Sequence, residues 1–124
     1  MKGLAAEKNF EKKVKDFLKE KNCWFLKTWS NGVQRSGVPD ILVCCNGYFL
    51  GIELKAPYGK PSELQIHNLL EIDKSFGYAL LLYPKDFELF KKLVTAIGEV
   101  DSQPEEYYQP FVDTLMHWKK RLQL

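Results

Sequence analysis

Residues 38–55 read VPDILVCCNGYFLGIELK, and this stretch decides the fold. Its two apolar halves, Val38 to Cys45 and Tyr48 to Lys55, have the length and composition of β-strands. The dipeptide Asn46-Gly47 between them is a strong signal for a two-residue hairpin turn. Because such a turn reverses the chain, the two strands are predicted to pair antiparallel. The unbroken apolar run from Ile41 to Val43 predicts that the first strand is buried on both faces.

The segment before this hairpin is predicted to contain a helix and a third strand. Between Glu7 and Lys21, apolar residues recur at helical spacing, at Phe10, Val14, Phe17 and Leu18. Cys23 to Trp29 is rich in apolar and aromatic residues, which is typical of a strand. The following residues, up to Gly37, contain turn signals.

The segment after the hairpin is predicted to contain a helix, a strand and further helices. Ser62 is the expected N-cap of a helix that reaches about Phe76, with Leu64, Leu69 and Ile72 facing the core and Gly77 closing it. Tyr78 to Tyr83 is the expected last strand, which a helical crossover places parallel to its neighbour. The expected fold is α/β, a mixed sheet flanked by helices. We expect one domain over residues 1–124, with a core of about 7–84 and extra C-terminal helices over about 85–124.

Composition favours a globular protein and excludes several classes. Hydrophobic residues make up 45% and charged residues 27% of the 124-residue chain, and the formal net charge is only +2. The expected location is the cytoplasm, because no stretch is apolar enough for a signal peptide or a membrane span. Three cysteines without a Cys-x-x-Cys pair support neither a disulfide framework nor a zinc site. No glycine-rich phosphate loop is present, so no nucleotide cofactor is expected.

The polar residues of the hairpin suggest a site that binds a cation and a phosphate. Asp40 begins the first strand, whereas Glu53 and Lys55 are two apart on the second and point to the same face. The turn would place Glu53 near Asp40. Two carboxylates can hold a hard cation such as Mg²⁺, and the lysine can stabilise charge on a phosphate. The alternative is an ion pair with a purely structural role, which any isolated Glu-x-Lys triplet favours.

The same residues resemble a known nuclease family. Gly37 to Asp40 followed by Glu53-Leu54-Lys55 resembles the signature of the PD-(D/E)XK nuclease superfamily. Residues 51–57 and 59–65 make the likeness more specific, because they are similar to the VRR-NUC family of virus-type replication and repair nucleases. Residues 85–124 have no counterpart in this resemblance. The resemblance implies a restriction-endonuclease-like fold.

The resemblance also implies roles for individual residues. Asp40, Glu53 and the backbone carbonyl of Leu54 would bind Mg²⁺ or Mn²⁺, and Lys55 would be the catalytic lysine. Gln65 matches a glutamine near the site, although it is also explained as an exposed helix residue. An acidic residue of the first helix would complete the site, and Glu11 is favoured over Glu7. An i, i+4 ion pair with Lys15 is the alternative role of Glu11. The candidate DNA contacts are Lys27, Arg35, Lys60 and Ser62.

The function implied is structure-selective DNA cleavage by a metal-dependent endonuclease. The expected substrates are branched DNA, such as Holliday junctions or flaps, in phage or bacterial replication, recombination or repair. A homodimer is expected, because two sites related by a two-fold axis can cut two strands symmetrically. Three alternatives remain: a non-selective endonuclease or nickase, an inactive DNA-structure-binding module, and a phage accessory protein that binds partners through its C-terminal helices.

Overall fold

The structure, a computed structural model, describes residues 2–29 and 36–124, with the backbone alone at residues 2–4. The helices are α1 (Lys2–Glu20), α2 (Glu63–Lys74), α3 (Phe87–Ile97) and α4 (Pro104–Arg121), with a short 3₁₀ turn η1 (Pro84–Asp86). The strands are β1 (Trp24–Lys27), β2 (Ile41–Cys45), β3 (Tyr48–Leu54) and β4 (Tyr78–Leu82).

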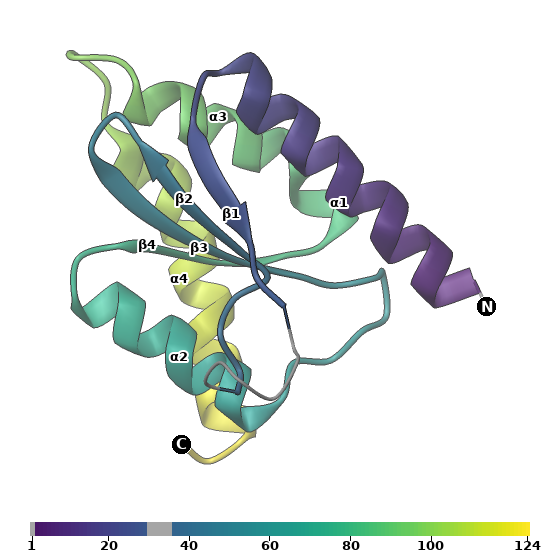
Figure 1. Cartoon of the computed structure of the whole chain (residues 1–124). Coiled ribbons are helices and arrows are strands. Elements are labelled where there is room, and N and C mark those ends of the chain that lie inside the picture. Colours follow the sequence, from purple (N-terminus) through teal and green to yellow (C-terminus); the bar gives the residue numbers. More distant parts are fainter. Residues whose placement is uncertain (1, 30–35) are drawn as a thin grey trace.

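The four described strands form one mixed sheet in the order β1-β2-β3-β4 (Figure 1). β1, β2 and β3 pair antiparallel, and β4 lies parallel to β3 after the α2 crossover. The predicted α/β class, with a mixed sheet flanked by helices, is therefore confirmed.

The hairpin turn at Asn46-Gly47 is confirmed, and it sets the register of the site. Asn46 has φ 52° and Gly47 has φ 85°, both left-handed, as a type I′ turn requires. The pairing runs from Cys45 opposite Tyr48 to Ile41 opposite Ile52. One further step along the same register brings Asp40 opposite Glu53.

Two apolar clusters hold the helices on the sheet. The larger joins α1 and α3 to one face of the sheet, and the smaller joins α2 and the C-terminal part of α4 to Ala79 and Leu81. α4 contributes Tyr108 and Phe111 to the first cluster and Leu115 to the second. The C-terminal helices therefore wrap the core.

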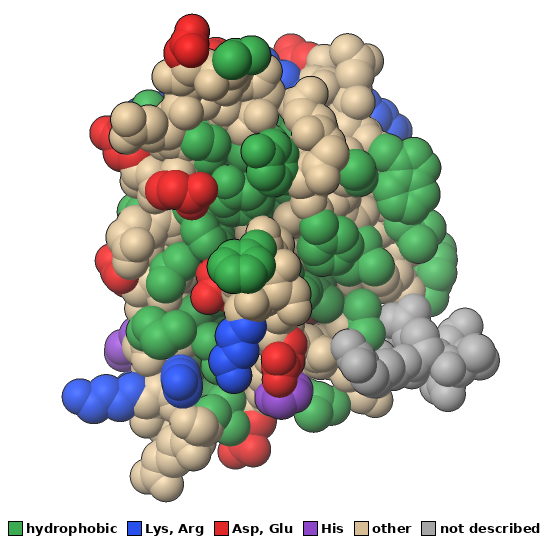
Figure 2. Space-filling view, turned by 90° about the vertical axis from the view of Figure 1, so that its left-hand side faces the viewer, with side chains coloured by type: hydrophobic (Ala, Val, Ile, Leu, Met, Phe, Trp, Pro, Cys, Tyr) green, Lys and Arg blue, Asp and Glu red, His purple; other side chains and the backbone are tan. Residues whose placement is uncertain are grey.

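Two burial predictions are wrong. Leu42 is only half-buried and Cys44 is exposed, so β2 is not buried on both faces. α2 packs on β3 and β4 and leaves this face of β1 and β2 open, where Trp24 is 65% exposed. Hydrophobic side chains accordingly reach the surface across the middle and right of Figure 2. Leu64 also points away from the core and is 48% exposed, because α2 instead buries Ile66, Leu69 and Leu70.

The predicted end of α2 is also wrong in detail. The left-handed residue after the helix is Phe76, with φ 68°, and not Gly77. Phe76 tolerates this conformation at the surface, where its side chain is 93% exposed. Gly77 is required by close packing, since a Cβ there would lie 2.9 Å from Cγ2 of Ile72.

The cysteines form a buried pair and one exposed thiol. Sγ of Cys23 lies 2.9 Å from Sγ of Cys45, and both are free thiols, as is the exposed Cys44. Burial, followed by the neighbouring Cys45, raises the pKa of Cys23 to about 12. Cys23 is therefore a protonated thiol at neutral pH.

Among the described helices, none combines the length and apolar character needed to cross a membrane.

Gly37→Ala is expected to lower the free energy of unfolding by about 2–4 kcal/mol. Gly37 has φ 78°, and a Cβ there would lie 2.9 Å from the backbone carbonyl carbon of Leu64. Left-handed strain costs roughly 1–3 kcal/mol, and overpacking against a backbone adds a similar cost. Chemical denaturation measures the loss.

Gly47→Ala is the matched control, because Gly47 has φ 85° but nothing lies within 4 Å of its Cβ position. Its free energy of unfolding should fall only by the cost of the left-handed conformation, about 1 kcal/mol. Equal losses in the two variants would show that the contact between Gly37 and α2 contributes nothing.

Candidate active site

Asp40 and Glu53 meet at the end of the β2–β3 hairpin. Oδ2 of Asp40 accepts a hydrogen bond of 2.8 Å from the backbone N–H of Leu54. Glu53 is buried beside it, with 3% of its surface exposed. The carboxyl group of Asp40 is close enough to influence that of Glu53, and Nζ of Lys55 lies 3.8 Å from Oε2 of Glu53. The structure therefore brings Asp40, Glu53 and Lys55 together, at the positions where the sequence predicts a site.

Burial is the main electrostatic influence on Glu53. It raises the pKa of this carboxyl group to about 9, and the charge and hydrogen bond of Asp40 add to the effect. The nearby Lys55 opposes the rise but does not cancel it. Glu53 is consequently protonated at neutral pH unless a further positive charge stabilises its anion.

Thr28, at the end of β1, fixes the backbone that carries Asp40. Its N–H donates to the carbonyl oxygen of Asp40 at 2.8 Å, and its Oγ1 donates to that of Pro39 at 2.8 Å. Sequence reasoning missed Thr28. Its role becomes clear from the register of β1 and β2. Lys27 pairs with Ile41, so the next residues along the two strands, Thr28 and Asp40, lie opposite each other.

Lys27 joins Glu11 to Asp40. Its Nζ lies 3.3 Å from Oε1 of Glu11 and 3.7 Å from Oδ1 of Asp40. Nζ of Lys15 lies 3.1 Å from the other oxygen of Glu11. Burial alone would raise the pKa of Glu11, but these two lysines outweigh it and lower that pKa. The predicted i, i+4 pair with Lys15 is thus present, and Glu11 reaches Asp40 through an ammonium group.

Glu7, one helical turn before Glu11, also acts on the site. Its negative charge contributes to the raised pKa of Glu53. Both alternatives for the acidic residue of α1 therefore lie on the side of the helix that faces the hairpin. They differ in their neighbours, since Glu11 is paired with lysines and Glu7 acts on Glu53.

Gln65 and Ser62 form a capping box at the start of α2. Oε1 of Gln65 accepts from the N–H of Ser62 at 2.9 Å, and Oγ of Ser62 accepts from the N–H of Gln65 at 3.2 Å. The predicted N-cap is confirmed. Within the described ranges, Gln65 makes no hydrogen bond to Asp40, Glu53 or Lys55.

The remaining candidate DNA contacts have different environments. Lys60 is exposed in the loop between β3 and α2. Lys27 is half-buried and engaged in the two ion pairs described above. Arg35 lies outside the described residues.

The donor chemistry of Asp40 and Glu53 fits a hard cation. The buried carboxyl group of Glu53 lies beside the half-buried carboxylate of Asp40, and a bound cation would offset the burial and the negative charge that raise the pKa of Glu53. Three carboxylates do not converge, since no group of three or more His, Cys, Asp or Glu side chains in the described part of the chain could hold a metal ion. Glu11 is held instead by its two lysines. The carboxyl groups that the structure does bring together are those of Asp40 and Glu53.

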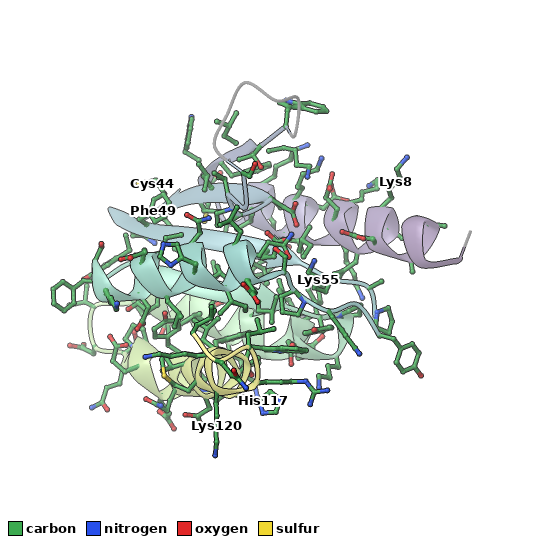
Figure 3. The ribbon with its side chains drawn as sticks, turned by 90° about the horizontal axis from the view of Figure 1, so that it is seen from below. Lys8, Cys44, Phe49, Lys55, His117 and Lys120 are labelled. Carbon is green, nitrogen blue, oxygen red and sulfur yellow. The ribbon has the colours of Figure 1, made fainter. Side chains whose placement is uncertain are left out.

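A basic cleft of about 640 Å³ adjoins the site between α1 and the end of β1. Four lysines line it, against two glutamates: Lys8, Lys12, Lys15 and Lys27, with Glu7 and Glu11. Lys8 projects from α1 into solvent (Figure 3). Such a surface attracts a polyanion despite the small net charge of the chain.

No protein-family profile, curated protein or solved structure matches this chain.

Proposed function

We propose that this chain is a metal-dependent endonuclease of the VRR-NUC type, with a restriction-endonuclease-like fold, that hydrolyses DNA phosphodiester bonds. The observation that carries the proposal is the buried carboxyl group of Glu53, next to Asp40 and 3.8 Å from the ammonium of Lys55. A buried acid with a raised pKa beside a second carboxylate is costly for folding. Such groups cluster at functional sites.

Each residue of the proposed site would have a different role in cleavage. Asp40, Glu53 and the carbonyl of Leu54 would hold Mg²⁺ or Mn²⁺, which when bound polarises the phosphodiester and lowers the pKa of water. Lys55 places a positive charge where a scissile phosphate gains negative charge. Thr28 keeps Asp40 in place, and Lys27 forms ion pairs with Asp40 and Glu11. The lysines of the α1 cleft would contact the phosphate backbone.

Branched DNA, such as a Holliday junction or a flap, is the proposed substrate, in the replication, recombination or repair of a phage or bacterium. The proposal includes a homodimer, because two sites related by a two-fold axis can make paired cuts. Both the substrate and the homodimer are proposed because residues 37–65 resemble the VRR-NUC signature.

An inactive DNA-structure-binding module is the second candidate, and one observation favours it. Lys27 pairs with Asp40 and Glu11, and Lys15 pairs with Glu11, so two ammonium groups face these two carboxylates. A charge network that is satisfied internally can be purely structural.

Cleavage of labelled four-way junction, flap, duplex and single-stranded DNA, with Mg²⁺, Mn²⁺ or EDTA, tests the proposal. We expect cutting in either metal and none in EDTA, with the branched substrates cut first. Equal cutting of all substrates would indicate a non-selective nuclease. Tight junction binding without cutting in either metal would refute catalysis and leave the binding module.

A further inference from the structure

A second cavity lies next to the candidate active site. It has a volume of about 550 Å³, within the roughly 300–1,000 Å³ of small-ligand sites. It lies between the loop after β3, the η1 turn and α4. Its aromatic and basic lining residues are Tyr58, Lys60, Tyr83, Lys85, His117 and Trp118.

The wall shared by the cavity and the active site is held in place. The cavity begins at Pro57, two residues after Lys55, and a Cβ at Gly59 would lie 3.4 Å from Cδ of Lys55. Tyr83 donates from Oη to the carbonyl oxygen of Gly59 at 2.7 Å, and Gly59 N–H donates to Ala56 at 2.9 Å.

The lining combines aromatic rings with positive charges, and Nζ of Lys85 lies 5.8 Å from the centroid of the Tyr83 ring. Tyr58 is 97% exposed, so its ring contributes almost nothing to the apolar core. The two acidic residues that line the cavity already accept hydrogen bonds from other residues of the chain. Asp86 accepts from the N–H of Tyr83, and Asp113 accepts from the side chain of Gln109. Lys60 and Lys85 are exposed. Aromatic faces that stack on bases, beside lysines that contact phosphates, are the elements of single-stranded nucleic-acid recognition.

We propose that this cavity takes one unpaired nucleotide of the DNA, with the base against Tyr58 and Trp118 and a phosphate near Lys60 and Lys85. The inference rests on the proposed function only in taking DNA as the ligand. It narrows the substrate to DNA with an unpaired base beside the phosphate at Lys55. Extruding such a base is cheapest where pairing is already lost, as at a branch or bulge.

The test uses two labelled duplexes that differ at one position. One carries a single unpaired adenine nucleotide, and the other carries an abasic residue at the same place. Affinities are measured by fluorescence anisotropy in EDTA, so that no cleavage occurs. We expect wild type to bind the adenine duplex at least about five-fold more tightly, the low end of base–aromatic stacking.

The variants separate base contact from phosphate contact. Tyr58→Ala should abolish the preference for adenine, whereas Lys85→Ala should weaken binding of both duplexes alike and reduce the salt dependence. Phe76→Ala is the matched control, because it removes an equally exposed ring outside the cavity and should keep the preference.

Equal affinity of wild type for the two duplexes, no binding of either, or an unchanged preference in Tyr58→Ala would overturn the proposal. Saturable quenching of tryptophan fluorescence by free dAMP that is lost in Trp118→Phe, without a preference between the duplexes, would assign the cavity to a free nucleotide and also overturn the proposal. A preference for adenine in a protein that cuts nothing in Mg²⁺ would support the cavity and refute the nuclease. Cleavage without the preference for adenine would support the nuclease and overturn the proposal for the cavity.

Discussion

Lys55→Met is expected to reduce metal-dependent DNA cleavage by about 10²- to 10³-fold, the usual cost of removing one preorganised electrostatic group. The ammonium of Lys55 is half-buried and lies 3.8 Å from Glu53, so its position is set before substrate arrives. Methionine keeps the length and apolar stem of the side chain but removes its charge. Single-turnover cleavage rates in Mg²⁺ measure the loss, and anisotropy in EDTA should show little change in DNA affinity.

Lys92→Met is the matched control, since Lys92 is exposed on α3 and belongs to neither proposed cleft. It should leave the cleavage rate within about two-fold of wild type, as expected for a charge far from the site. If Lys55→Met cut DNA at the rate of this control, Lys55 would be a structural partner of Glu53 and no more. A loss confined to DNA affinity would make it a binding residue.

The hairpin explains why the centre of the site could be predicted from sequence. A two-residue turn at Asn46-Gly47 leaves one register for the strands on either side. That register puts Asp40 opposite Glu53, and the alternation of a strand puts Lys55 on the same side as Glu53. Local rules of turn and strand geometry are therefore sufficient to predict that Asp40, Glu53 and Lys55 lie together.

The surroundings of the site depend on contacts that local rules do not contain. Thr28 supports Asp40 only because β1 pairs with β2, and Lys27 meets Glu11 only because α1 packs beside that strand. The sequence predicts Lys27 as a candidate phosphate contact, but it does not indicate that Lys27 lies between two carboxylates. The exposure of Cys44 and Leu64 likewise follows from where α2 docks, which no periodicity determines.

The electrostatic state of Glu53 is a further property that could not be predicted. The sequence indicates proximity to Asp40, but the raised pKa comes first from burial, which depends on the packing of the helices around the sheet. Between its ordinary pKa of 4.5 and its folded-state pKa of about 9, the folded protein binds a proton that the unfolded chain releases. Without metal, the free energy of unfolding therefore falls as pH rises through this range, by at most about 1.4 kcal/mol per pH unit.

Glu53→Gln is accordingly expected to abolish cleavage and to stabilise the fold. The glutamine amide has the size of the protonated carboxyl group and can donate a hydrogen bond, and it carries no charge to desolvate. In EDTA the variant should match wild type near pH 4.5 and exceed it by about 2–3 kcal/mol near pH 7, or roughly 5–10 °C in Tm. Thermal melts from pH 5 to 9 measure the difference, with the exposed Glu99→Gln as a control that should show no such trend.

The response to metal gives the same prediction a second readout. A cation held by Glu53 stabilises the folded state by mass action, so millimolar Mg²⁺ or Mn²⁺ should raise the Tm of wild type. Glu53→Gln lacks one of the two carboxylates and should respond much less. A variant that is less stable than wild type at pH 8 would show that Glu53 is ionised and well paired in the fold. Equal metal responses in the two proteins would remove Glu53 from the proposed cation site, whatever the cleavage assay showed.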